Sequence, residues 1–256
     1  SISPEFHLND SKELKPKTIA DLKSLKKKRE KLILEGEIKD MNVNHGIFQN
    51  DAEVAAHATQ NAATAPGDIR FKDINDDNVI DDDDKTFIGN PIPDFTYGFS
   101  IGLNYENFDF SLQGNGVQGN EIYNVSKVSL IDNSQSLNKL NFTPWSSTNT
   151  NSTYPRAIDS DPNKNLRNSS YFVEDGSFLR IKTIQLGYSV SQKYLSKLGM
   201  SKFRLYGGVQ NPFTFTKYSG LDPEVGNAGG SNLVSGIDNF VYPMARVFSI
   251  GLNAQF

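Results

Sequence analysis

Apolar and polar residues alternate strictly in an eleven-residue segment, 95–105. Thr, Gly, Ser and Asn fill the positions between the large apolar side chains. Successive side chains of a strand point to opposite faces, so this pattern predicts one strand with an apolar and a polar face. About this length also lets a tilted strand cross a bilayer. The apolar positions are Phe95, Tyr97, Phe99, Ile101, Leu103 and Tyr105.

The same alternation returns later in the chain and predicts four further strands. Residues 106–107 are too few for anything but a tight hairpin, in which Asn107 tolerates a positive φ. The later strands are predicted at 108–113, 178–190, 202–215 and 248–256, the last of which ends on the aromatic Phe256.

Short and long connections alternate between the predicted strands. The short ones are 106–107 and 191–201, and the long ones are 119–177 and 216–245. In an up-and-down meander this order puts every long connection on one side, as in transmembrane barrels with long extracellular loops. We therefore predict an all-β, antiparallel up-and-down meander that forms the C-terminal strands of an incomplete transmembrane β-barrel, because closure needs at least about eight strands.

The N-terminal part has a different character. Residues 1–45 are charge-dense and predict a short, solvated helical segment, with Ile19, Leu22 and Leu25 on a narrow apolar face. A helix on a membrane surface is the alternative. No apolar core of a signal peptide precedes Lys15, so we expect that the chain has lost its true N-terminus. Residues 46–94 are predicted to be an extracellular loop region, followed by the strands of 95–256.

Composition excludes several classes of protein. A chain with 37% hydrophobic residues and a mean hydropathy of -0.48 reads as soluble, but a barrel averages its two faces to similar values. The absence of cysteine excludes disulfides and thiolate sites, and a net charge of -4 gives no reason to expect nucleic-acid binding. No stretch is apolar enough for a transmembrane helix.

Five ordered segments resemble the SusC/RagA family of TonB-linked outer-membrane proteins, and the resemblance covers about residues 46–256. They include the strings PGDIRFKDINDDNVIDDDDKTFIGNPIPDFTYGFS and VEDGSFLRIKTIQLGYS. Their order is similar to that at the end of the barrel in that family. The segments are 66–100, 114–124, 173–189, 206–225 and 242–256.

The resemblance implies a location and partners. The intact protein would be a TonB-dependent receptor in the outer membrane of a Bacteroidota-type cell, in contact with outer-membrane lipid. A SusD-like lipoprotein would cap it and TonB would energise it, for the import of oligosaccharides or, less often, peptides. Import proceeds by binding and gating, so the resemblance implies no catalytic residues and no enzyme.

The acidic segment 73–84 has the ligand spacing of an EF-hand loop. Side-chain ligands would occupy positions 1, 3, 5, 9 and 12, with a carbonyl at position 7. Asn78 replaces the usual glycine and can adopt a left-handed conformation, and Ile80 is the apolar anchor. Oxygen ligands without His or Cys favour Ca²⁺. The predicted metal ligands are Asp73, Asn75, Asp77, Val79, Asp81 and Asp84; a solvated acidic loop is the alternative.

Two other features admit a second interpretation. Residues 114–119 match G-x-G-x-x-G, but the strand before them alternates and no helix start follows, so no cofactor site is predicted. The long segment 119–177 holds Trp145, Tyr154 and Tyr171 among many amides, a mixture that suits sugar binding and is equally ordinary for long loops. The alternative function is a secreted, calcium-stabilised β-sandwich that binds carbohydrate or mediates adhesion.

Overall fold

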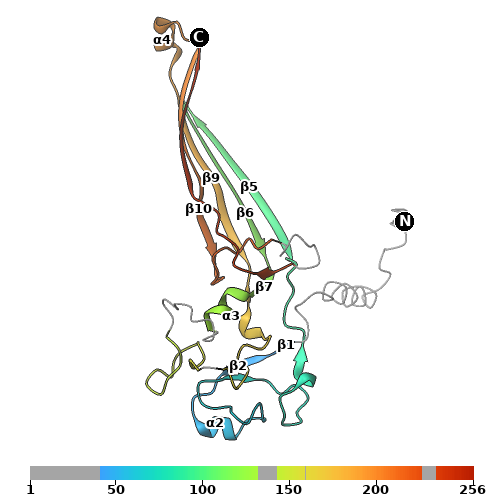
Figure 1. Cartoon of the computed structure of the whole chain (residues 1–256). Helices are drawn as coiled ribbons and strands as arrows, with labels where there is room; N and C mark the ends of the chain where they lie inside the picture. Colours follow the sequence, from blue (N-terminus) through green and yellow to red (C-terminus); the bar gives the residue numbers. More distant parts are fainter. Residues whose placement is uncertain (1–40, 132–142, 159, 227–234) are drawn as a thin grey trace, which may run out of the picture. The chain divides into compact units, whose positions relative to one another are not determined.

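The structure is a computed structural model that describes residues 41–131, 143–158, 160–226 and 235–256. Strands make up most of its regular structure (Figure 1). None of the described helices is long and apolar enough to cross a membrane.

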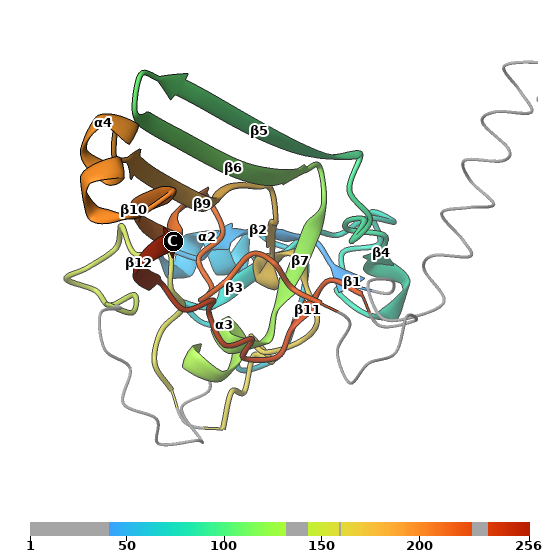
Figure 2. The same ribbon diagram turned by 90° about the horizontal axis from the view of Figure 1, so that it is seen from above.

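A five-stranded antiparallel sheet is the largest element. Its strands follow one another in the order β12-β10-β9-β6-β5, along an arc when viewed from above (Figure 2). The prediction of five meandering strands is confirmed, and β6 extends beyond the predicted residue 113 to residue 118. The strands are β5 (Phe95–Tyr105), β6 (Phe108–Gln118), β9 (Phe178–Ser189), β10 (Lys202–Thr216) and β12 (Val247–Gln255).

The register places apolar residues beside apolar residues across the whole sheet. Tyr105 pairs with Phe108, Phe108 with Tyr188, Tyr188 with Leu205, and Leu205 with Leu252. Paired residues point to the same face, so this row crosses all five strands. Its members are exposed, from 38% for Tyr188 to 74% for Tyr105. The sheet therefore presents a continuous apolar face that no described residue covers.

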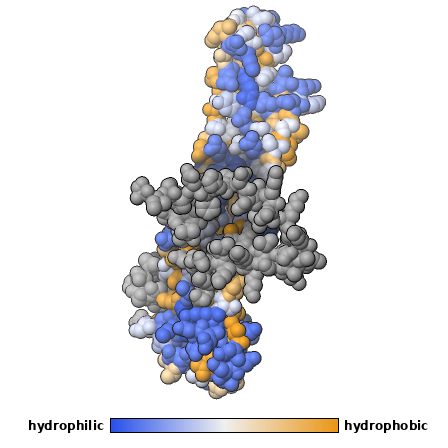
Figure 3. All heavy atoms as spheres, turned by 90° about the vertical axis from the view of Figure 1, so that its right-hand side faces the viewer, coloured by the Kyte–Doolittle hydropathy of each residue, from blue (hydrophilic) through white to orange (hydrophobic). Residues whose placement is uncertain are grey.

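The opposite face of the same strands is polar. Asn104 pairs with Asp109 and Ser100 with Gln113 on β5 and β6. Hydrophobic residues border the hydrophilic ones along the upper part of Figure 3, where the strands lie. A β-sandwich would bury the aromatic face under a second sheet, and the described residues contain no such sheet.

An irregularity in β9 shifts the phase of its alternation. Thr183 pairs with Gln113 and Ile181 with Gly114, which leaves Lys182 as an extra residue, a β-bulge. Opposite it, β10 has an irregularity at Asn211, which has a φ of 50°. Leu179 and Ile181 consequently share the apolar face of Ile184, which a strict period of two would not allow.

All long connections leave from one end of the sheet, as predicted, but they are folded segments rather than simple loops (Figure 1). β7 (Glu121–Asn124) lies between β8 (Val173–Asp175) and β11 (Ile237–Asp238), so residues 119–177 and 216–245 share a small sheet. The other pairs are β1 (Met41–Asn42) with β4 (Lys85–Thr86) and β2 (Asn44–Ile47) with β3 (Ile69–Phe71).

Short helices complete the connections. The α-helices are α2 (Asp51–Ala55), α3 (Val125–Ile131) and α4 (Gln192–Leu195). The 3-10 helices are η1 (Asp82–Asp84), η3 (Ser170–Phe172) and η4 (Ser196–Leu198).

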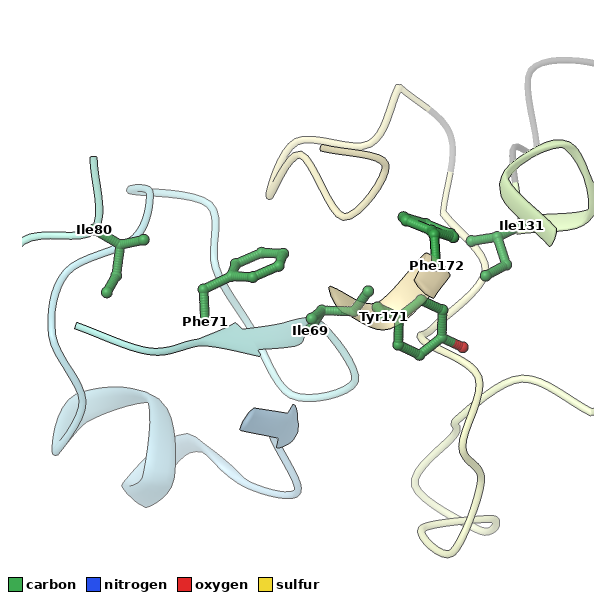
Figure 4. Packing of buried hydrophobic residues seen from close by; sticks show 6 residues of the cluster. All are labelled: Ile69, Phe71, Ile80, Ile131, Tyr171 and Phe172. Carbon is green, nitrogen blue, oxygen red and sulfur yellow. The ribbon is translucent and has the colours of Figure 1, made fainter. Parts of the chain in front are cut away.

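The hydrophobic core lies in the connections and not against the sheet. Six buried residues from segments far apart in the sequence pack together, as Figure 4 shows. Burial of apolar surface here stabilises the long connections, at roughly 1.5–3 kcal/mol for each large side chain. The members are Ile69, Phe71, Ile80, Ile131, Tyr171 and Phe172.

Three local predictions need correction. The predicted helical segment does not extend to residue 45, because β1 and β2 occupy residues from 41 onward; residues 1–40 lie outside the described residues. In the 106–107 hairpin the left-handed residue is Glu106, with a φ of 50°, and not Asn107. A helix does follow the glycine-rich segment, since α3 begins at Val125, and the Asn124 side chain accepts a hydrogen bond from the Lys127 N–H (2.9 Å).

Candidate functional site

A buried arginine stands on the polar face of the sheet, next to the long connections. Arg180 on β9 is 2% exposed, and its Nε donates to Thr214 Oγ1 on β10 (3.0 Å). Its two terminal nitrogens donate to carboxylates of the 217–226 segment, Nη1 to Glu224 (2.8 Å) and Nη2 to Asp222. A buried charge is tolerated only when it is paired and hydrogen-bonded, and Arg180 satisfies both conditions.

Asp222 joins both ends of the 217–246 segment to this arginine. It is 3% exposed and accepts from the backbone N–H of Glu224 (2.9 Å) and of Met244 (3.1 Å). Burial alone would raise the pKa of the Asp222 carboxyl, but these two N–H donors and the Arg180 guanidinium outweigh burial and lower it below its usual value. The carboxylate therefore holds the segment against the sheet in its ionised form.

Lys182, the extra residue of the bulge in β9, is a second cation of the cluster. Lys182 Nζ lies 2.9 Å from Glu224 Oε2, the same oxygen that Arg180 Nη1 contacts. Residues 180 and 182 would share a face in a regular strand as well. Because of the bulge, Thr183 also points to this polar face. The cluster thus contains two cations and two carboxylates, and its formal charges cancel.

A cavity of about 370 Å³ adjoins the cluster. Strand residues of the polar face form its floor, and the two ends of the 217–246 segment form its walls. Its lining residues are Arg180, Asn211, Pro212, Thr214, Thr216, Gly220, Leu221, Asp222, Pro223, Pro243, Met244 and Arg246.

Tyr218 and Asp238 fasten the same segment a second time. Tyr218 is buried and its hydroxyl donates to Asp238 Oδ2 (2.6 Å), while Asp238 Oδ1 accepts from the Val241 N–H (2.8 Å). Burial first, and then the carboxylate, raise the pKa of Tyr218 well above its usual range, so the hydroxyl stays a donor. The walls of the cavity are therefore held in place from both ends.

A second ion pair spans three strands near the short connections. Arg204 on β10 donates through Nε to Asp109 on β6 (2.9 Å), across the intervening strand β9. Gly187 of β9 lies beneath it, and a Cβ there would stand 2.5 Å from both Arg204 Nη2 and Asp109 Oδ1. The glycine makes the close approach of the two charged groups possible.

The predicted calcium loop has a suitable backbone, but its side chains are engaged elsewhere. Asn78 is left-handed (φ 66°), as predicted, and Ile80 is buried in the hydrophobic core. Asp73 accepts from the N–H groups of Asp76 and Asn78 (both 2.8 Å). Among the described residues, no three His, Cys, Asp or Glu side chains are gathered as a metal ion requires. Calcium binding therefore stays a prediction.

The remaining predicted ligands show the same hydrogen-bond pattern. Asn75 accepts from the Asp77 N–H, Asp77 from the Val79 N–H, and Asp81 from the Asp83 N–H. Asp84 is fully buried, and its two oxygens accept from the N–H groups of Ile74 (2.7 Å) and Asp81 (2.9 Å). Backbone N–H donors thus hold these side chains.

Two aromatic residues suggested for sugar binding pack inside the connections. Trp145 Nε1 donates to Gln49 Oε1 (2.9 Å). Tyr171 belongs to the core and its hydroxyl donates to the Thr153 carbonyl (2.8 Å). These two rings support the fold of the 119–177 segment rather than an open sugar-binding surface.

The Arg180 cluster escaped the sequence prediction. Its partners lie 42 and 44 residues away in the chain, and spacing within a strand carries no information on such contacts. One signal was present: Arg180 and Lys182 are adjacent basic positions on a polar face, and Asp222-Pro223-Glu224 supplies carboxylates in a later connection.

Comparison with known proteins finds TonB-dependent receptors that are similar to the chain. No family model matches it. It is 36% identical to TonB-dependent receptor P3 of Formosa agariphila over 215 residues, which cover 82% of this chain and 21% of the relative. It is 32% identical to TonB-dependent receptor SusC of Bacteroides thetaiotaomicron over 230 residues, 81% of this chain and 21% of that receptor.

Solved structures show the same fold. The RagAB peptide transporter aligns with a TM-score of 0.62 at 20% identity, over 84% of this chain and 22% of the transporter chain. The RagAB peptide importer in its closed-closed state aligns with a TM-score of 0.59. The chain thus spans about a fifth of the length of the curated relatives that it matches.

Proposed function

Because the chain belongs to the SusC/RagA family of TonB-dependent receptors, we propose that it forms the C-terminal strands of an outer-membrane barrel that imports oligosaccharides or other large nutrients. Such receptors bind and pass on their ligands and are not enzymes. No residue of this chain is therefore assigned a catalytic role.

The exposed apolar face is the observation that carries this proposal. Phe248 and Ile250 on β12 are 76% and 87% exposed, and Tyr105 on β5 is 74% exposed. Exposure of such a face to water costs free energy, whereas contact with the hydrocarbon of a bilayer does not. β12 and β5 also have unpaired edges among the described residues, and within a closed barrel neighbouring strands would pair with these edges.

The polar face and the folded connections have complementary roles in this proposal. The polar face lines the interior, and the connections at the long-loop end form the outer mouth. A SusD-like lipoprotein would dock on that mouth, and TonB would supply energy from the opposite side of the membrane. The family resemblance supports these partners.

The 73–84 segment adds a proposed calcium site at the mouth. Asp73, Asn75, Asp77, Asp81 and Asp84, with the Val79 carbonyl, would supply oxygen ligands after giving up part of their hydrogen bonds to the backbone. The bound ion would offset the repulsion among the carboxylates and stiffen the loop. The left-handed Asn78 and the buried Ile80 support this proposal.

Uptake of labelled oligosaccharides by cells that carry the protein tests the import function. We expect that the protein is found in the outer-membrane fraction, and that deletion of its gene or of TonB abolishes uptake of at least one oligosaccharide. Uptake that is unchanged for every oligosaccharide offered, with the protein in the soluble fraction, would contradict the proposal.

A further inference from the structure

The cavity beside Arg180 contains one cation that is left without a partner. Arg246 lines it, and the Arg246 side chain makes no hydrogen bond or ion pair with the part of the chain that the structure describes. The charge of Arg180, by contrast, is compensated by Asp222 and Glu224. Of the ionic groups that line the cavity, Arg246 alone has a charge that remains available to a ligand.

The neutral lining supplies groups that suit a sugar. Thr214 accepts from Arg180 Nε, so its hydroxyl proton is free to donate into the cavity. Asn211 uses its Nδ2 to donate to the Ala245 carbonyl (3.1 Å), which leaves its Oδ1 as an acceptor. A donor and an acceptor that are both fixed by other contacts recognise hydroxyl groups without further ordering.

The walls of the cavity carry apolar side chains beside Asp222 and Arg246. They include two proline rings, Leu221 and Met244, while Pro212 of β10 belongs to the floor. Ligand pockets in proteins combine such walls with a few placed polar groups, and the volume of about 370 Å³ lies within their usual range. Rigid rings can lie against the C–H face of a pyranose while its hydroxyls reach Thr214 and Asn211. The two prolines of the walls are Pro223 and Pro243.

We propose that this cavity binds an acidic sugar unit, with the anionic group on the Arg246 guanidinium and the ring hydroxyls on Thr214 and Asn211. The planar fork of an arginine donates two parallel N–H bonds to a carboxylate and also binds sulfate esters. This inference rests on the proposed import function, whose substrate class it narrows to oligosaccharides that carry carboxylate or sulfate groups.

Saturation-transfer NMR titration of the whole chain in zwitterionic detergent micelles at low salt tests the proposal. The probes are glucuronate, glucose 6-sulfate and glucose, which share the pyranose ring and differ in charge. A charge-assisted bond favours the acidic probes, and we expect about tenfold tighter binding of at least one of them than of glucose. Whichever acidic probe binds more tightly identifies the anionic group.

Two variants assign the binding to this cavity. Arg246→Gln should remove the preference for the acidic probe, because it replaces the guanidinium by an uncharged amide on a shorter side chain. Lys193→Gln on α4 is the matched control; it deletes a cation near the short connections and should leave the preference unchanged.

Three results would overturn the proposal. They are equal binding of the charged and neutral probes, a preference that survives in Arg246→Gln, and no binding of any probe to the folded chain. The titration measures neither membrane insertion nor TonB-dependent uptake. Failure here would therefore leave the import function standing.

Discussion

The ion pair between Arg204 and Asp109 depends on a residue that has no side chain. Gly187 lies on the strand between them, and any Cβ at this position would stand 2.5 Å from both charged groups. The Arg204 guanidinium also lies 4.9 Å from the Tyr206 ring centroid, so the pair is held by an aromatic neighbour as well. One glycine thus allows β6 and β10 to be linked across β9.

Gly187→Ala should therefore break the ion pair and destabilise the sheet, by about 1–3 kcal/mol if the charged groups cannot move away. Gly102→Ala is the matched control, because a Cβ at Gly102 on the same face would have no atom within 4 Å. Urea unfolding in detergent micelles measures both. Equal stability of the two variants would show that the pair does not depend on the glycine.

The Asp222 carboxylate makes the 217–246 segment sensitive to acid. The pKa of this carboxyl in the folded protein is lowered below its usual value, so its stabilising effect is fully present at neutral pH. The effect is lost as the pH falls from the unfolded value of about 3.8 through the lowered folded value. Asp222→Asn should remove this part of the pH dependence of unfolding; an unchanged profile would contradict the role of Asp222.

Calcium binding to the 73–84 segment is measurable by calorimetry. We expect a binding heat at or below millimolar Ca²⁺, and its loss in the double variant Asp73→Asn/Asp77→Asn, which removes two ligand charges. Asp51→Asn, at an exposed position in α2, is the control and should bind as before. If folded protein gives no binding heat with millimolar Ca²⁺, the segment is a hydrogen-bonded loop that binds no calcium, and the proposed site is wrong.

Among the elements, the five long strands could be predicted from the sequence and the bulge could not. The alternation of apolar and polar residues predicts both that β5 is a strand and which of its side chains share a face, because successive side chains of a strand point to opposite faces. In β9 the phase changes at Lys182, a change that depends on pairing with β6 and β10. The left-handed turn residue was also missed, since Glu106 has no intrinsic preference for positive φ.

The two faces of β5 should respond oppositely to a charge. Ile101→Lys places an ammonium on the apolar face and should cost about 2–4 kcal/mol near the bilayer midplane. Ser100→Lys, one residue away on the polar face, should cost much less. The fraction of chain that folds into liposomes measures the difference. Similar folded fractions for both variants would contradict a lipid-facing position of Ile101.

For the whole molecule, the folded connections were the least predictable part. The segments 119–177 and 216–245 read as loops, because their strands are two to four residues long and pair with each other across distant segments. The Arg180 cluster has the same origin, since its two carboxylate partners lie 42 and 44 residues further along the chain, in the connection 216–245. Periodicity reports on a single element, and contacts between elements leave no comparable pattern.

The aromatic face of β5 should contact lipid in the intact barrel. Because the chain contains no cysteine, single cysteines can be introduced at each position from 95 to 105 and spin-labelled in liposomes. Collision rates with oxygen and with a water-soluble nickel complex then report the surroundings of each label. We predict high oxygen and low nickel accessibility at the odd positions, and the reverse at the even ones. Odd positions shielded from both reagents would show that this face is buried against protein, which would contradict the account.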